Sequence, residues 1–154
     1  MSDQCLQETY APHNACFGCG QANDLGLGLQ SFPEGDEVVA LFRPQDHHQA
    51  FPNVLNGGII GSILDCHCNW TAAWHLMREH GTEKPPCTVT MEYTIRLLRP
   101  TPMDGPIELR ARVRESDGRK VSVEATLTAG GHVCASCSGR FASVPPGHPA
   151  YNAW

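Results

Sequence analysis

The residues best suited to chemistry gather in one stretch, LNGGIIGSILDCHCNW, at residues 55–70. A single acid, Asp65, stands among apolar residues, and Cys66-His67-Cys68 follows it directly. A carboxylate in apolar surroundings has a raised pKa, which suits a general base. Consecutive side chains on a helix point about 100° apart, so these three metal-type ligands cannot converge on one ion. Asp65 is therefore the first candidate for catalysis.

The glycine pair Gly57-Gly58 lies at the predicted start of the same helix. A helix start offers unpaired backbone N–H groups and a positive dipole end, which together suit an oxyanion or a polarised carbonyl. Asp65 is eight residues beyond Gly57, about 12 Å along the helix axis. One substrate carbonyl cannot be held by Gly57 and reached by Asp65 of the same chain. A catalytic role for both predicts an antiparallel pair of helices about a two-fold axis, and hence a dimer.

A second pair of potential ligands, Cys16 and Cys19 in CFGCG, has the spacing of a zinc knuckle. A closed zinc site needs two further ligands, which the sequence does not place. We therefore predict no metal and no cofactor. A zinc-stabilised interaction module built on this pair stays as an alternative.

The surrounding sequence predicts an α+β fold. Residues 57–80 are apolar around almost the whole helix circumference, which is typical of a buried helix, with Asn56 as its N-cap and Gly81 as its stop. Two strands are expected before it, at 25–32 and 38–43. Four follow, at 87–100, 107–115, 119–128 and 132–141, where apolar and polar residues alternate. Such a helix must be wrapped by the apolar face of the antiparallel sheet.

The strand at 87–100 is expected to alternate without interruption. Val89, Met91 and Tyr93 then share one face, and Thr90 and Glu92 share the other. We expect residues 1–24 to form an N-terminal loop segment, 25–144 the main domain and 145–154 a C-terminal tail.

Composition narrows the function further. The chain has 154 residues, eight cysteines and a net charge of −5. The charge argues against nucleic acid as a partner. No apolar run is long enough for a membrane-spanning helix, and the N-terminus lacks the pattern of a secretory signal. We therefore expect no membrane association, a cytoplasmic location and reduced thiols.

Taken in order, these motifs resemble the hotdog-fold acyl-CoA thioesterases of the PaaI-like type, in the 4-hydroxybenzoyl-CoA thioesterase superfamily. The shared pattern is a glycine pair, a long helix and an acid seven residues after the second glycine, here Gly58 to Asp65. CFGCGQANDLGLGL, HHQAFPNVLNGG, TVTMEYTIRLLRPTP and GRKVSVEATL are similar to further segments of the family. The departure is Asn56, because the usual pattern has histidine there.

The resemblance implies a hotdog fold, a homodimer or homotetramer, and hydrolysis of an acyl-CoA thioester to a carboxylic acid and free CoA at the dimer interface. Asp65 would act as general base or nucleophile, and Gly57 with Gly58 would polarise the carbonyl beside the capping Asn56. The expected substrate-binding residues are Gln49, Asn69, Thr90, Arg119 and Lys120. Arg119 and Lys120 would meet CoA phosphates, although a solvated hairpin end explains them slightly better.

Two rival functions use the same fold. An enoyl-thioester hydratase or dehydratase would pair the acid with a histidine, and Asn56 removes the obvious one. A non-catalytic acyl-CoA-binding hotdog protein would have little use for a buried carboxylate.

Overall fold

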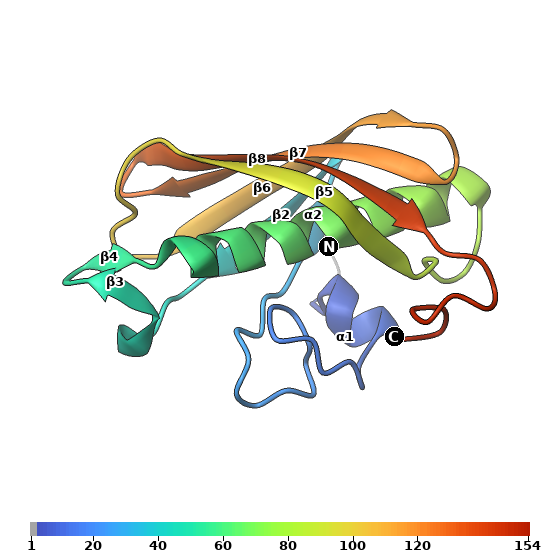
Figure 1. Cartoon of the computed structure of the whole chain (residues 1–154), viewed down its shortest axis with the longest axis horizontal. Helices are drawn as coiled ribbons and strands as arrows, with labels where there is room; N and C mark the ends of the chain where they lie inside the picture. Colours follow the sequence, from blue (N-terminus) through green and yellow to red (C-terminus); the bar gives the residue numbers. More distant parts are fainter. Residues whose placement is uncertain (1–2) are drawn as a thin grey trace.

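The computed structural model describes residues 3–154, so Met1 and Ser2 of the predicted N-terminal segment lie outside the described residues. Its centre is one long helix, α2, which packs against a six-stranded antiparallel sheet of order β1-β2-β6-β7-β8-β5 (Figure 1). The elements are α1 Leu6–Tyr10, β1 Phe32–Glu34, β2 Glu37–Phe42, a 3-10 turn Asp46–His48, β3 Gln49–Phe51, β4 Val54–Leu55, α2 Gly57–His80, β5 Thr88–Leu97, β6 Ile107–Ser116, β7 Lys120–Ala129 and β8 His132–Ser143. The predicted α+β fold, a long helix wrapped by an antiparallel sheet, is confirmed.

Helix α2 begins and ends where its sequence signals predict. The Asn56 side chain accepts a hydrogen bond from the Ile59 N–H (3.1 Å), which satisfies one of the unpaired donors of the first turn. Gly81 ends the helix in the left-handed conformation (φ 66°), which glycine adopts without a steric cost. Between these caps most of the helix surface is buried, in agreement with its apolar sequence.

The sheet covers α2 with alternate residues of each strand. In β7, for example, Val121, Val123, Ala125, Leu127 and Ala129 are buried while their neighbours are not. Polar residues on the opposite face form ion pairs, such as Arg112 and Arg114 with Glu124 (2.7 and 2.8 Å). This one-sided burial is what an antiparallel sheet with a single covered face requires.

The N-terminal segment packs against the side of α2 that faces away from the sheet (Figure 1). The prediction of a loop throughout residues 1–24 is wrong at Leu6–Tyr10, which form α1, capped by the Cys5 side chain. Leu6 and Cys19 are buried in the common core. The opposite end of the chain returns to the same region, where Trp154 stacks on Trp70 at 4.3 Å between ring centroids.

The first predicted strand, at 25–32, is also wrong for most of its length, because β1 begins at Phe32. The N–H groups of Leu27 and Leu29 donate instead to the carbonyls of Phe17 and Gly18, at 2.7 and 3.0 Å. Gly28 between them has φ +62°. The alternating leucines therefore bind the N-terminal segment rather than the sheet.

No helix among the described residues is both long and apolar enough to cross a membrane.

Candidate active site

Asp65 lies half-buried in the middle of α2, on the side that faces strand β5. Its Oδ1 accepts a hydrogen bond of 2.6 Å from the Thr90 hydroxyl. None of the other described residues hydrogen-bonds to this carboxylate, so Oδ2 is free to meet a water molecule. Burial raises the pKa of Asp65, and the Thr90 hydrogen bond partly offsets that rise. A carboxylate held at one oxygen and free at the other has the arrangement of a general base.

A β-bulge in β5 determines which side chains of this strand reach α2. The pairing with β8 shifts register between Thr90 and Glu92, leaving Met91 as the extra residue. The predicted uninterrupted alternation is therefore wrong. Thr90 faces the helix before the bulge, whereas Tyr93 faces it afterwards and Glu92 pairs with Arg140 (3.5 Å).

Tyr93 is a site residue that the sequence did not reveal. Its hydroxyl lies over Gly61, one helical turn before Asp65. A Cβ placed on Gly61 would be in van der Waals contact with the hydroxyl oxygen. Burial and then the negative charge of Asp65 raise the pKa of the Tyr93 hydroxyl. A uniform alternation would have grouped Tyr93 with Met91. The bulge that separates them leaves no recognisable signal in the sequence.

The glycine pair lies exposed at the N-terminus of α2, as predicted. The Asn56 N–H donates to the His48 carbonyl (2.9 Å), which fixes the approach to the helix. Its side-chain oxygen would be 2.9 Å from a Cβ on Gly58, so the cap leaves little room for a larger residue there. Within the described structure the N–H groups of Gly57 and Gly58 have no hydrogen-bond partner, and they remain available to a ligand.

Leu97 of β5 lies against Gly57. β5 therefore runs alongside α2 towards the helix start: Thr90 contacts Asp65, Tyr93 lies over Gly61, and Leu97 reaches Gly57. β5 is also the last strand of the sheet, and its other edge is unpaired among the described residues. Several large apolar side chains are exposed here: Met91, Tyr93 and Leu97 on β5 and Leu98 just after it are 43–59% exposed. An edge strand with exposed apolar side chains is a surface suited to pairing with another chain.

Asn69 lies one helical turn beyond Asp65 and faces the start of β5. Its amide donates to the Thr88 carbonyl at 3.3 Å, and the Thr88 hydroxyl donates to the Asn69 carbonyl at 3.4 Å. The side-chain Oδ1 is buried without a hydrogen-bond partner among the described residues. An unpaired buried acceptor is costly unless a water molecule or ligand donates to it.

Comparison with known proteins identifies the family. The family model described as the thioesterase superfamily matches residues 52–136, more than half of the chain. The chain is 34% identical to a thioesterase superfamily protein from Shewanella loihica, over 81% of this chain and 98% of that one, with a TM-score of 0.67. The chain belongs to the thioesterase superfamily.

Other structures match this thioesterase superfamily member in fold. A conserved protein from Pseudomonas aeruginosa is 24% identical over 77% of this chain and 90% of that one, with a TM-score of 0.63. The PaaI protein from the phenylacetic acid degradation operon of E. coli is 15% identical over 77% and 81%, with a TM-score of 0.64. The predicted PaaI-like hotdog fold is confirmed. A search of curated proteins found no match.

The remaining predicted substrate residues are not brought together with Asp65 within this thioesterase superfamily chain. Gln49 is exposed on β3, where it pairs with Leu55 just before the N-terminus of α2. Arg119 lies in the turn before β7 and Lys120 is the first residue of that strand, and the N–H groups of both donate to Asp117. Gly118 of this turn lies next to His80, at the other end of α2 from Gly57. A 24-residue helix, about 36 Å long, separates the two places.

The three ligand-type residues after Asp65 point in three directions, as predicted. Cys66 faces the N-terminal segment, where its sulfur is 3.8 Å from that of Cys16. His67 is fully buried between the Ser31 hydroxyl and the Val38 carbonyl, both at 2.8 Å. Cys68 is buried against Cys137. Both ring nitrogens of His67 are engaged, so this histidine does not serve the pairing with Asp65 that a hydratase would use.

A broad hollow on the outer face of the sheet lies apart from Asp65. It is lined in part by Arg96, Arg110 and Arg112. Arg110 contacts Glu34, Glu37 and Glu108 at 3.0–3.6 Å, and Arg112 contacts Glu124. These ion pairs balance the positive charge that the clustered arginines bring to this face.

Proposed function

We propose that this chain hydrolyses acyl-CoA thioesters at a site shared by two copies of itself, with Asp65 from one copy and the Gly57 end of α2 from the other. The observation that carries the proposal is the hydrogen bond from Thr90 to Asp65 beside the unpaired apolar edge of β5. It presents a half-buried carboxylate at the surface that a second chain would cover.

Two further features support a shared site. Gly57 and Asp65 are about 12 Å apart along one helix, too far for one carbonyl to use both. Gly61 is midway between them, beneath the Tyr93 hydroxyl. A two-fold axis level with Gly61 would bring each glycine end opposite the other chain's carboxylate, with the two β5 strands side by side.

In this arrangement the Asp65 carboxylate takes a proton from water as the water oxygen attacks the thioester carbonyl carbon. The oxyanion that forms accepts hydrogen bonds from the Gly57 N–H, with Gly58 alongside. The carbon–sulfur bond then breaks, and the proton passes from Asp65 to the leaving thiolate. The products are the carboxylic acid and free CoA. In the alternative route Asp65 itself attacks the carbonyl and water hydrolyses the resulting anhydride.

The first experiment measures loss of thioester absorbance across an acyl-CoA panel for wild type, Asp65→Asn and Glu92→Gln. We expect Asp65→Asn to be at least about a hundredfold slower, the usual contribution of an acid–base group. Glu92 is an exposed acid on β5, the strand that contacts Asp65 through Thr90, so Glu92→Gln serves as the matched control and keeps its rate. If wild type and Asp65→Asn are equally inert across the panel but bind acyl-CoA, the protein is a binder and the proposal is wrong.

The glycine end has an equally direct test. Gly57→Pro deletes the N–H but suits the first position of a helix, and Asn56 already has the extended backbone (φ −60°, ψ 133°) that precedes proline. Gly57→Ala adds a similar Cβ beside Leu97 and keeps the N–H. We expect the proline variant to lose about 10²- to 10³-fold in kcat and the alanine variant to stay active. Equal losses would show that bulk, and not the N–H, matters at Gly57.

Mixing the two inactive variants tests whether the site is shared. In a hybrid of Asp65→Asn and Gly57→Pro subunits, one of the two sites regains both intact groups. Random pairing of equal amounts makes half of the dimers hybrid, so roughly a quarter of the wild-type activity should return. No recovery in verified hybrids would show that each site lies within one chain.

A further inference from the structure

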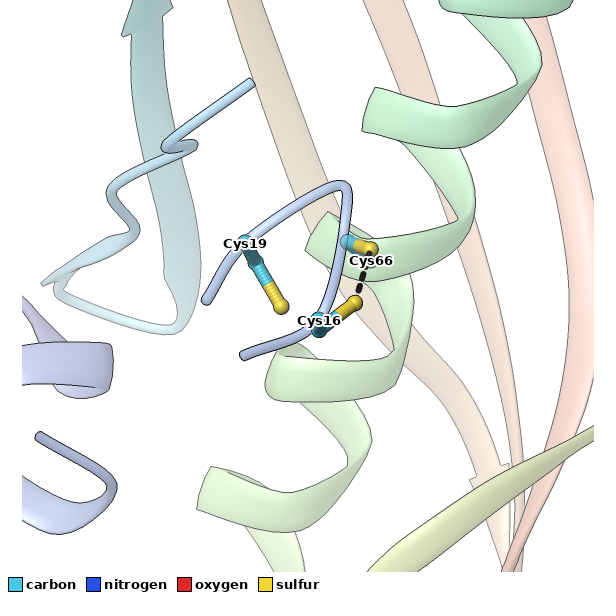
Figure 2. Close-up of side chains that lie close together, drawn as sticks. All are labelled: Cys16, Cys19 and Cys66. Carbon is cyan, nitrogen blue, oxygen red and sulfur yellow. Dashed lines mark hydrogen bonds between the residues drawn. The ribbon is translucent and has the colours of Figure 1, made fainter. Parts of the chain in front are cut away.

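Three thiols from distant parts of the sequence meet on the side of α2 that faces away from the sheet (Figure 2). Cys16 and Cys19 come from one turn, residues 16–20, which we call the knuckle turn, and Cys66 comes from the helix. All three sulfur atoms lie within 4.8 Å of one another. Cys66 therefore offers one of the two further ligand atoms that CFGCG lacked in the sequence.

The knuckle turn is shaped around these sulfurs. The Gly20 N–H donates to the Cys16 carbonyl at 2.8 Å, and the N–H groups of Gly18 and Cys19 are directed at the Cys16 sulfur. A Cβ on Gly18 would overlap the Cys66 sulfur, and one on Gly20 would overlap the backbone of the turn itself. Both glycines are therefore needed for the turn to close over the thiols.

The Cys19 sulfur has a hydrogen-bond donor of its own, from the side chain of Trp70. Cys19 is 8% exposed, and the Trp70 indole N–H is directed at its sulfur. Trp70 comes from the same helix as Cys66, one turn further on, and its ring is fixed by stacking on Trp154. The three thiols thus form one cluster at the contact between the knuckle turn and α2.

We propose that Cys16, Cys19 and Cys66 bind one thiophilic metal ion of the zinc type through three thiolates, with the fourth position open to solvent. Two thiolates about 2.3 Å from a tetrahedral zinc are about 3.8 Å apart. The Cys16 and Cys66 sulfurs are 3.8 Å apart. Cys19 completes the set with a small side-chain adjustment, because its sulfur lies within 4.8 Å of both others.

The open position follows from the exposure of the three residues. Cys16 is exposed, Cys66 half-buried and Cys19 buried, so the metal's free side faces solvent beside Cys16. Binding converts three thiols and one dication into the complex and releases three protons, with no oxidant required. The bound ion would fasten the N-terminal segment to the middle of α2.

The test uses Co²⁺ as a spectroscopic substitute for Zn²⁺ on the fully reduced protein under anaerobic conditions. We expect one Co²⁺ per chain, with sulfur-to-metal charge-transfer bands whose intensity matches three thiolates, and displacement of the ion by Zn²⁺. Cys16→Ser, Cys19→Ser and Cys66→Ser should each lower the affinity at least tenfold. Cys87→Ser is the matched control, because Cys87 is half-buried at the start of β5, outside the cluster.

Three results would overturn the proposal. One is the absence of stoichiometric Co²⁺ or Zn²⁺ binding by the reduced wild type. Another is an unchanged spectrum in Cys66→Ser, which would mean adventitious binding by the exposed turn alone. The last is a disulfide between Cys16 and Cys66, or between Cys16 and Cys19, that remains after treatment with reductant. Peptide mapping by mass spectrometry would detect it. Cys16 is exposed, so we expect Cys16→Ser to fold. A loss of metal binding in this variant can therefore be distinguished from a loss of stability.

Zinc should also raise the melting temperature of the wild type and leave that of Cys16→Ser unchanged. Neither readout involves a thioester, so this proposal and the proposed hydrolysis succeed or fail separately.

Discussion

Acidification should destabilise this protein through one buried histidine, His67. Its Nε2 lies 2.8 Å from the Val38 carbonyl and must donate to it. Its Nδ1, 2.8 Å from the Ser31 hydroxyl, must then accept. The Ser31 oxygen in turn accepts from the Gln7 amide at 3.0 Å. Each donor in this buried chain has its acceptor while the ring is neutral, and a proton on Nδ1 would take from the Ser31 hydroxyl hydrogen the acceptor that it has there.

Burial lowers the pKa of His67 from 6.5 to about 4 in the folded protein. The unfolded chain therefore binds the proton more readily, and folded stability falls as the pH drops from 6.5 towards 4. Above pH 6.5 this contribution is fully present. At pH 5 the loss is about 1.5 pH units at 1.36 kcal/mol each, or about 2 kcal/mol. That is a large part of the stability of an ordinary domain.

The assay is urea unfolding near pH 7 and near pH 5, at one protein concentration, for wild type and His67→Gln. Glutamine has an amide donor for Val38 and an oxygen for Ser31 but does not titrate. We expect the wild type to lose about 2 kcal/mol more than the variant between the two pH values. Equal losses would refute the reasoning, because the other titrating groups, common to both proteins, would then account for the whole effect.

Three further predictions address the other parts of the molecule. Thr90→Val removes the hydrogen bond that lowers the pKa of Asp65, so the acid limb of kcat/KM should move to higher pH; an unchanged pH profile would contradict this role. Gly20→Ala forces a Cβ into the backbone of the knuckle turn and should weaken Co²⁺ binding at least tenfold, whereas Gly105→Ala, where the added Cβ meets open space, should not. Met91→Lys places a charge on the exposed edge of β5 and should weaken self-association at least tenfold in analytical ultracentrifugation; wild-type sedimentation would argue against pairing through this edge.

The sequence was sufficient for the parts of the fold that local signals determine. Helix α2 has a capping Asn56, a terminal Gly81 and continuous apolar periodicity, and each of these signals acts on residues close to it in the sequence. The same holds for β6 and β7, where the alternation of apolar and polar residues matches the buried face. Asp65 could be singled out because an acid in an apolar helix is unusual, whatever its partner.

The features that sequence reasoning missed depend on contacts between distant residues. The bulge at Met91 redirects Tyr93 towards the helix, yet the strand reads as a uniform alternation. Residues 25–30 have the alternation of a strand, but the N–H groups of Leu27 and Leu29 donate to carbonyls of the N-terminal segment. Cys66 could not be joined to Cys16 from the sequence, because fifty residues separate them. In each case the missing information is which segment packs opposite.

Neighbouring positions on one helix give α2 two separate chemical faces. Asp65 and Cys66 point about 100° apart, so the first meets β5 and the second meets the knuckle turn. The carboxylate is therefore held by the strand that a second chain would cover, and the thiols are held by the chain's own N-terminal segment. A metal at Cys66 would fix that segment to the turn of α2 that carries Asp65 while leaving the Thr90 contact in place. Loss of the metal should then weaken the attachment of residues 5–31 to α2. Loss of the Thr90 hydroxyl should instead change the pKa of the Asp65 carboxyl directly.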